Sequence, residues 1–260
     1  MLLHIGTFQL DQDSHHLTLW HRLAPQIRLL CALLFVFFTS FTPNGHWETW
    51  KIYGLGLILL ILASKVSLSV LLQRVAIESA FIGVVLLGTL FRDGGEILWQ
   101  WGWFRITTEG VTVLGSVSFK AILCLLMLNL LVLTTPITQL LSALTILKTP
   151  PLLVAILSSM YRYLGLLIEE AETMRRAALS RNLMNNAQWQ RLIIGNTIGL
   201  LFIRTYQRGE RVYQAMLARG YQGVPMITQS PTLAPRDWLA LSLMVALLLL
   251  GQGIYLLFEN

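Results

Sequence analysis

The sequence predicts an all-α integral membrane protein, with about five transmembrane helices plus a cytoplasmic platform of long amphipathic helices. Hydrophobic residues make up 55% of the 260 residues and charged residues only 12%, against roughly 25% in soluble domains. Nearly charge-free apolar segments flank a charged region, about 136–236, that holds most of the arginines. Arginine at the inner face of a membrane protein explains the net charge of +6, so we expect contact with the lipid bilayer and not with nucleic acid.

Five apolar segments are candidates for the spans, since a helix needs roughly 20 apolar residues to cross the hydrocarbon core. The second candidate is short because Lys51 and Lys65 bracket it. Aromatic residues at its start, Trp47, Trp50 and Tyr53, favour a real span over a re-entrant segment. The five predicted spans are 27–43, 50–64, 74–91, 110–134 and 237–258.

The distribution of basic residues predicts the orientation. With the N-terminus inside, the outer loops hold only Lys51, Arg92 and Arg105 of the 19 basic residues. We therefore expect a protein of the plasma (inner) membrane whose N-terminus and charged region are cytoplasmic. The predicted parts are an N-terminal transmembrane region at 1–136, a cytoplasmic helical region at 137–236 and a C-terminal transmembrane helix at 237–260.

The charged region is predicted to contain two long amphipathic helices, after a short one at 137–148. The first begins at Leu152, after Pro150 and Pro151, and keeps the three-and-four apolar spacing until it stops near 181–182. The second runs from about 188 to Gly220, where glycine suits a helix C-cap and Pro225 prevents continuation.

Charged side chains on these two helices suggest both local pairs and an exposed face. Glu172 is one turn from Arg175 and Arg176 and can pair with either. Three arginines of the second helix share one face, which is either solvated or directed at lipid headgroups or a partner: Arg204, Arg208 and Arg211.

Arg219 differs from these because it lies in the last turn between Ala218 and Gly220. A guanidinium with such small neighbours can lie against a partner and form bidentate bonds to a carboxylate there. Spacing alone favours the simpler role of complementing the helix dipole.

The segment ERVYQAMLARGY at 210–221 resembles the second coupling helix of CbiQ-type proteins. These are the transmembrane (T) components of energy-coupling factor (ECF) transporters, a branch of ABC importers. Other segments resemble the family in the same chain order: HRLAPQIR at 21–28, TTP at 134–136, LLSAL at 140–144, YRY at 161–163, EEA at 169–171 and MRRA at 174–177.

The family carries an Ala-Arg-Gly signature at the end of each coupling helix. The second signature is intact as Ala218, Arg219 and Gly220. By position, the first is Ser180, Arg181 and Asn182. Asparagine can adopt the left-handed conformation that glycine offers, and serine is nearly as small as alanine, so Arg181 is expected to keep its role. The resemblance adds four supporting residues: Glu172, Arg175, Arg176 and Arg211.

The resemblance implies that two cytoplasmic ABC ATPase subunits each receive one coupling-helix end. The chain would then link their motion to a separate substrate-binding membrane subunit of the CbiM/NikM type, in cobalt or nickel import. It would have no catalytic residue and no cofactor of its own, with ATP and Mg bound by the ATPase subunits. The sequence contains no Gly-x-x-x-x-Gly-Lys-Ser/Thr phosphate loop.

A metal site in this chain is not expected, because no carboxylate or cysteine cluster completes one around the histidines. The metal would instead be bound by the substrate-binding subunit. The histidines considered are His4, His15, His16, His21 and His46.

Three other functions were weighed. A membrane-embedded enzyme would need polar groups in the spans, which carry only Glu78 and Lys120. A self-sufficient permease would require paired intramembrane charges or broken helices in two halves of the chain. The sequence shows no internal repeat that would provide two such halves. A T component of a vitamin-type ECF transporter stays open, since only the resemblance favours cobalt or nickel.

Overall fold

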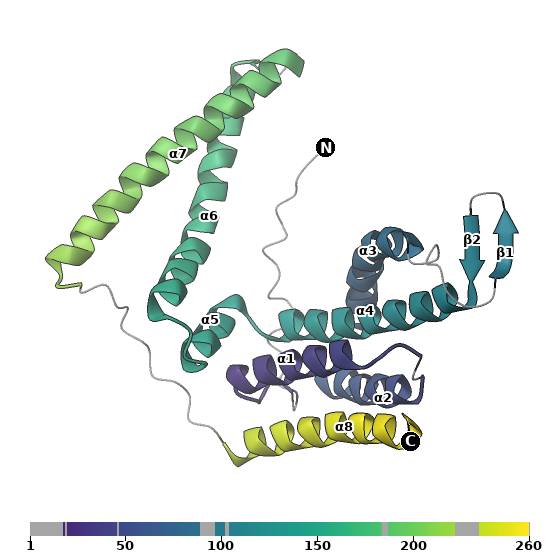
Figure 1. Ribbon diagram of the computed structural model, residues 1–260. Coiled ribbons are helices and arrows are strands. Elements are labelled where there is room, and N and C mark those ends of the chain that lie inside the picture. Colours follow the sequence, from purple (N-terminus) through teal and green to yellow (C-terminus); the bar gives the residue numbers. More distant parts are fainter. Residues whose placement is uncertain are drawn as a thin grey trace. The chain divides into compact units, whose positions relative to one another are not determined.

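The computed structural model describes residues 18, 20–45, 47–88, 97–101, 104–183, 187–221 and 234–259 (Figure 1). The chain forms two compact units. We call the first, Met1–Ala143 with Pro231–Asn260, the membrane unit. The second, Leu144–Ser230, is called the hairpin unit.

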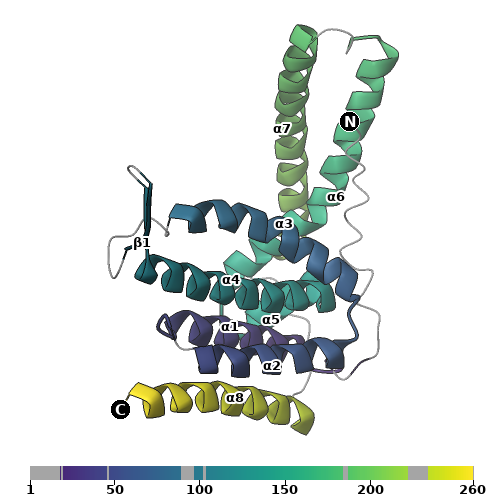
Figure 2. The ribbon, with the colours of Figure 1, turned by 90° about the vertical axis from the view of Figure 1, so that its right-hand side faces the viewer.

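The membrane unit contains a helix at each of the five predicted spans. In chain order these are α1 (Pro25–Phe41), α2 (Trp47–Ser64), α3 (Leu68–Leu87), α4 (Thr108–Thr134) and α8 (Pro235–Glu259). α1 packs against α4 and α8, α2 packs against the same two helices, and α3 packs against α4. Both views show α1, α2, α4 and α8 running side by side (Figures 1 and 2). The fold is that of an all-α membrane protein, as predicted.

Three described helices are long and apolar enough, by length and composition, to cross a membrane: Thr108–Thr134, Pro151–Ser180 and Pro235–Gly253. The first and third coincide with predicted spans. The second is α6, which the sequence places in the cytoplasmic platform. Its first half carries one charge, Arg162, whereas its second half carries the Glu169–Arg176 charges. Composition alone does not distinguish a span from a helix that presents an apolar surface to a partner.

A small β-hairpin lies in the predicted outer loop at 92–109. β1 (Ile97–Trp101) and β2 (Phe104–Thr107) pair antiparallel. Thr107 then caps α4, because its Oγ1 accepts a hydrogen bond from the Gly110 N–H at 3.1 Å. β1 and β2 are the only strands among the residues that the structure describes.

The core of the membrane unit lies where α1, α2, α4 and α8 meet. Phe35, Tyr53, Met127 and Leu248, one from each helix, are fully buried. Phe35 and Tyr53 contact edge to face, with ring centroids 6.0 Å apart.

Small residues allow α2 and α8 to approach closely. A Cβ added at Gly251 would lie 2.4 Å from Cε1 of Tyr53, and one added at Gly56 would lie 2.4 Å from Cδ1 of Leu247. Glycine at such contacts brings helix backbones together in a membrane, where packing and not water drives association.

Gly251→Ala is expected to destabilise the membrane unit by about 1–3 kcal/mol, the usual cost of overpacking a full core. Tyr53 is fully buried and has no room to move away. The matched control is Gly253→Ala, since a Cβ there meets nothing within 4 Å. Thermal unfolding in mild detergent compares the two, and equal midpoints would contradict the close contact.

A buried arginine joins the start of α1 to the end of α4. Arg28 is only 4% exposed. Its Nη1 donates to the carbonyl oxygen of Thr134 at 2.6 Å and to Oγ1 of Thr135 at 3.0 Å. Its Nε donates to the Leu23 carbonyl at 3.1 Å. Carbonyls in the last turn of a helix have no partner within the helix, so the guanidinium satisfies groups that α4 leaves open.

Asp237 makes the corresponding connection between α1 and α8. It is 2% exposed, and Oδ1 accepts from the Ala24 N–H at 3.0 Å while Oδ2 accepts from the Ala234 N–H at 2.8 Å. The second bond is a side chain in the first turn reaching back to the N-cap, as in a capping box. Asp237 also interacts electrostatically with Arg28.

Two further bonds complete this polar layer. Trp20 Nε1 donates to Thr134 Oγ1 at 3.1 Å, and Thr18 Oγ1 donates to the Ser64 carbonyl at 3.2 Å. The starts of α1 and α8 and the ends of α2 and α4 therefore lie at one face of the membrane unit. The chain leaves α4 and returns to α8 at this same face.

Asp237→Ala is expected to destabilise the membrane unit by about 2–4 kcal/mol, because it leaves two partly buried N–H groups without an acceptor and the buried Arg28 without its counter-charge. Glu48→Ala is the control, since Glu48 forms an exposed pair with Lys51 at 2.7 Å and such pairs contribute about 0–1 kcal/mol. A thermal midpoint of Asp237→Ala no lower than that of Glu48→Ala would contradict a stabilising role of the Asp237 hydrogen bonds between α1 and α8.

The hairpin unit consists mainly of two long helices, α6 (Pro151–Ser180) and α7 (Ala187–Ala218). Their bounds agree with the predicted helices from 152 to 181–182 and from 188 to 220. α6 starts with Pro151 at its first position, where the missing N–H costs nothing. The short helix predicted at 137–148 is α5 (Ile137–Ile146), within which the boundary between the two units falls.

Candidate partner-docking site at two helix ends

α6 ends in a Schellman motif centred on the altered signature. Asn182 has a φ of 54°. Its N–H donates to the Leu179 carbonyl at 2.9 Å, and the Leu183 N–H donates to the Ala178 carbonyl at 3.1 Å. These are the two bonds that define the motif, with Arg181 as C-cap and Asn182 as the left-handed residue after it.

α7 ends in the same motif at the intact signature. Gly220 has a φ of 81°. Its N–H donates to the Leu217 carbonyl at 2.9 Å, and the Tyr221 N–H donates to the Met216 carbonyl at 3.0 Å. Arg219 directly follows the last helical residue, as Arg181 does in α6.

The two signatures therefore have equivalent backbones in spite of their different sequences. Asn182 adopts the left-handed conformation that Gly220 adopts at the other end. Asparagine does so at a modest cost because its short polar side chain tolerates this region. Each helix thus presents an arginine at the same position of the same motif.

Both signature arginines are exposed and available to a partner. Ser180 and Ala218, which precede them, and the left-handed residues that follow are exposed as well. Within the described part of the chain neither Arg181 nor Arg219 has an ion-pair partner. A guanidinium held at a helix C-terminus is favoured by the helix dipole, and it can still form bidentate bonds outward.

The arginine stripe on α7 has a structural role that the sequence did not reveal. Arg204 Nη1 lies 2.9 Å from Glu170 Oε1, and Arg208 Nη2 lies 4.0 Å from Glu170 Oε2. Glu170 is on α6, so the two arginines connect the helices of the hairpin. Arg211 is exposed and borders a shallow polar depression with Gln207 and Gln214.

The predicted pairing of Glu172 with Arg175 or Arg176 is not observed among the described ion pairs. All three side chains are exposed. Exposed pairs along one helix gain only about 0.2–0.5 kcal/mol, so water competes with them. Glu170 instead pairs across the hairpin, where its side chain is only 18% exposed.

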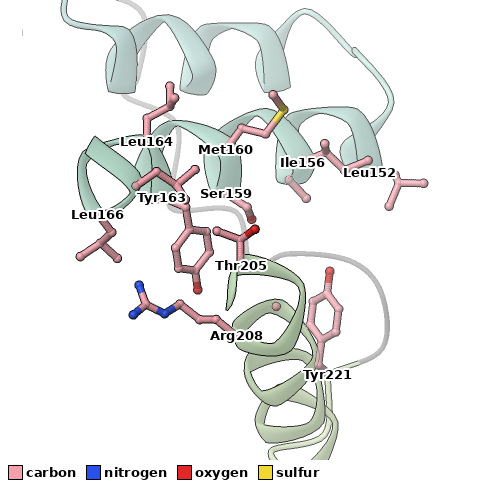
Figure 3. A pocket seen from close by; sticks show the side chains of 13 residues that line it. Leu152, Ile156, Ser159, Met160, Tyr163, Leu164, Leu166, Thr205, Arg208 and Tyr221 are labelled. Carbon is pink, nitrogen blue, oxygen red and sulfur yellow. The ribbon is translucent and has the colours of Figure 1, made fainter. Parts of the chain in front are cut away.

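An apolar cleft of about 450 Å³ lies between α6 and α7 (Figure 3). α6 contributes Leu152, Ile156 and Met160, which are 51–61% exposed. Tyr163 from α6 and Arg208 from α7 approach the cleft from opposite helices. The sequence indicated an apolar face on α6 but not that this face remains open.

The part of the chain that the structure describes shows no metal site at a histidine. Within the described residues no group of three or more His, Cys, Asp or Glu side chains could hold a metal ion. His21 lies in the polar layer, with Nδ1 hydrogen-bonded to Thr18 Oγ1. The other four histidines, at positions 4, 15, 16 and 46, lie outside the described residues.

The fold and the helix ends define a class: a polytopic helical membrane protein with an attached helical hairpin that presents two equivalent arginine-capped ends. Comparison with known protein families then shows to which family within this class the chain belongs. Residues 16–230 match the CbiQ family, described as cobalt transport protein, and the chain belongs to that family. The resemblance seen in the sequence to CbiQ-type T components is confirmed.

Curated relatives extend the comparison to the transmembrane proteins of ECF transporters. The chain is 26% identical over 242 residues to EcfT of Lacticaseibacillus paracasei, covering 87% of this chain and 90% of that protein. It is 29% identical over 218 residues to EcfT of Bacillus subtilis, covering 79% and 82%. A proposed fused cobalt transport protein, CbiMQ of Methanocorpusculum labreanum, is 28% identical over 148 residues, covering 56% of this chain and 24% of that protein.

Substitutions at the left-handed residues test the equivalence of the two ends. Asn182→Gly is expected to keep the motif, whereas Gly220→Val forces a branched side chain into the left-handed region at a cost of about 1–2 kcal/mol. Amide hydrogen exchange at Tyr221, whose N–H closes the motif, should then accelerate about tenfold.

Gly209→Ala is the control for Gly220→Val, because Gly209 lies inside α7 with open space around it. Alanine is the better helix former there, so no loss is expected. Unchanged exchange at Tyr221 in Gly220→Val would show that the last turn does not depend on the left-handed residue.

Proposed function

We propose that this chain is the T subunit of an ECF-type ABC importer for cobalt or nickel ions. It would transmit the motion of two cytoplasmic ABC ATPase subunits to a separate substrate-binding membrane subunit. The observation that carries the proposal is the pair of equivalent helix ends, each with an exposed arginine. Two ATPase subunits would need two docking elements, and α6 and α7 would supply them.

The docking chemistry follows from the residues at each end. Arg181 and Arg219 would enter an acidic groove on each ATPase subunit, while the small exposed neighbours Ser180, Asn182, Ala218 and Gly220 allow close approach. Buried arginines at the centre of an interface contribute disproportionately to its affinity. Arg175, Arg176 and Arg211 would support the contact from the flanks, together with Glu172.

The hairpin is suited to carry a displacement along its length. α6 and α7 have 30 and 32 residues, which makes each about 45–48 Å long at 1.5 Å per residue. The Glu170 pairs with Arg204 and Arg208 couple the two helices between their ends. A push at either arginine would therefore move both helices.

The substrate-binding subunit would be of the CbiM/NikM type and would need an apolar surface to pack against. The open cleft between α6 and α7 offers such a surface, with Leu152, Ile156 and Met160 exposed. Apolar surface left uncovered by a protein's own fold marks a site of association.

This chain would have no enzymatic activity, since ATP and Mg would be bound by the ATPase subunits. The N-terminus and the hairpin would be cytoplasmic, in the plasma (inner) membrane, where the basic residues are favoured. In support, the chain leaves and rejoins the membrane unit at the face where α1 begins.

The proposal of cobalt or nickel as the transported ion is supported by the family description and by the CbiMQ relative, both of which name cobalt transport. The EcfT relatives favour a second candidate, because their names specify an ECF transporter and no metal. A T subunit that serves a vitamin-binding subunit remains that alternative.

Arg181→Glu/Arg219→Glu is expected to weaken ATPase association at least tenfold, because charge reversal opposes an acidic groove. Co-purification in mild detergent with candidate ATPase subunits measures this. The control is Arg162→Glu, an exposed arginine of α6 outside both signatures. Unchanged association in the double variant would disprove the docking role.

Uptake by the assembled complex decides the cargo. Radioactive cobalt and nickel are expected to accumulate with the unaltered chain and not with the double variant. Normal ATPase association without uptake of either metal would exclude these ions and favour the vitamin-type alternative.

A further inference from the structure

We propose that a groove on the membrane unit binds one anionic phospholipid, from the leaflet at the face where α1 and α8 begin. The groove has a volume of about 580 Å³ and lies among α1, α2 and α8. This site is separate from the helix ends proposed to bind ATPase subunits.

The shape of the groove suits an acyl chain. Cys31 and Phe35 of α1 are fully buried and form its floor. Its walls come from α2 and α8, where Leu59, Leu239 and Leu243 are 59–69% exposed. These leucines offer apolar contact along the groove that no described part of the chain covers.

The length of the groove matches one leaflet. It extends along α8 from Arg236 to Leu247, which is about 16 Å at 1.5 Å per residue. The hydrocarbon core is about 30 Å thick, so this is roughly the depth of a single layer of acyl chains. Gly56 and Leu247, both in the lining, pack closely, since a Cβ added at Gly56 would lie 2.4 Å from Cδ1 of Leu247.

Two arginines border the groove at the membrane face. Arg22 precedes α1, and Arg236 lies in the first turn of α8. Both are exposed, and neither is in an ion pair with another described residue. The neighbouring carboxylate of Asp237 is directed to the Ala24 and Ala234 N–H groups.

The position of Arg236 is unfavourable for α8 itself. A cation in the first turn opposes the helix dipole, which favours negative charge there. A phosphate held between Arg22 and Arg236 would neutralise both guanidinium charges and remove the unfavourable interaction of Arg236 with the helix dipole. Basic pockets between transmembrane helices on the cytoplasmic side are suited to anionic headgroups, and this step rests on the orientation given under the proposed function. The predominantly apolar lining favours a lipid over free phosphate.

Lipid retention by the full chain tests the proposal. The chain is reconstituted in vesicles of equimolar phosphatidylcholine and phosphatidylglycerol, extracted in mild detergent, and analysed by native mass spectrometry. Phosphatidylglycerol should be retained over phosphatidylcholine, and the preference should fall about fivefold for each arginine removed in Arg22→Gln/Arg236→Gln. Equal retention of the two lipids by the unaltered chain would overturn the site.

Matched variants separate a specific site from general charge. Lys51→Gln/Lys65→Gln also removes two exposed positive charges but not from the groove, so it should keep the preference. Arg22→Lys/Arg236→Lys keeps both charges and should retain most of it, which distinguishes headgroup attraction from damage to the fold. If the preference for phosphatidylglycerol fell equally in the two glutamine double variants, the proposal of a specific site would be overturned.

Filling the groove tests the acyl-chain contact. Ala63 is exposed and lines the groove, so Ala63→Trp should lower retention of both lipids. Unchanged lipid retention in Ala63→Trp would overturn the proposal. If association with the substrate-binding subunit is lost in the same variant, the groove accommodates a helix of that partner instead.

Discussion

The buried guanidinium of Arg28 is the interaction on which the membrane unit depends. A charge that is 4% exposed is tolerated only where hydrogen bonds replace its water. Arg28 obtains them from the end of α4, at the Thr134 carbonyl and the Thr135 hydroxyl. Asp237 makes the matching connection to α8 through the Ala24 N–H. The two points where the chain leaves and rejoins the membrane unit are thereby held to α1, which provides a fixed base for any movement of the hairpin.

The sequence predicted the positions of the helices because the signals are local. Apolar length, the Pro150-Pro151 break and the glycine at 220 place most helix ends within about three residues. The exception is α3, which begins at Leu68, six residues before the predicted start at 74. Nothing local indicates that Arg28 is buried, and the sequence identified it only as part of the HRLAPQIR segment at 21–28 that resembles the family. Its partners lie at 134–135 and near 237, and such long-range pairing is decided by tertiary packing. The small β-hairpin at 97–107 was missed for the same reason, since pairing of two short strands is not visible in either strand alone.

In the candidate site, too, the features set by neighbouring residues could be predicted from the sequence, and those set by tertiary packing could not. The conformation of Asn182 follows from residue chemistry alone, and the structure has it at a φ of 54° beside 81° at Gly220. The pairing of Glu170 with Arg204 depends on how α6 packs against α7, whereas the sequence indicated only a pairing of Glu172 with an arginine one turn away on the same helix. Two of the three stripe arginines thus pair within the hairpin, whereas Arg181 and Arg219 at the helix ends have no ion-pair partner among the described residues.

Trp20 belongs both to the proposed lipid site and to the polar layer. Its side chain is 5% exposed and lines the groove, while its Nε1 donates to Thr134 Oγ1 at 3.1 Å. A phospholipid in the groove would therefore pack against the same indole that helps to fix the end of α4. Because Arg22 and Arg236 line the same groove from the starts of α1 and α8, a headgroup bound to both would also draw these two starts together. The lipid would then stabilise the same contacts as Arg28 and Asp237, so the rigidity of the base would depend on the anionic lipid content of that leaflet.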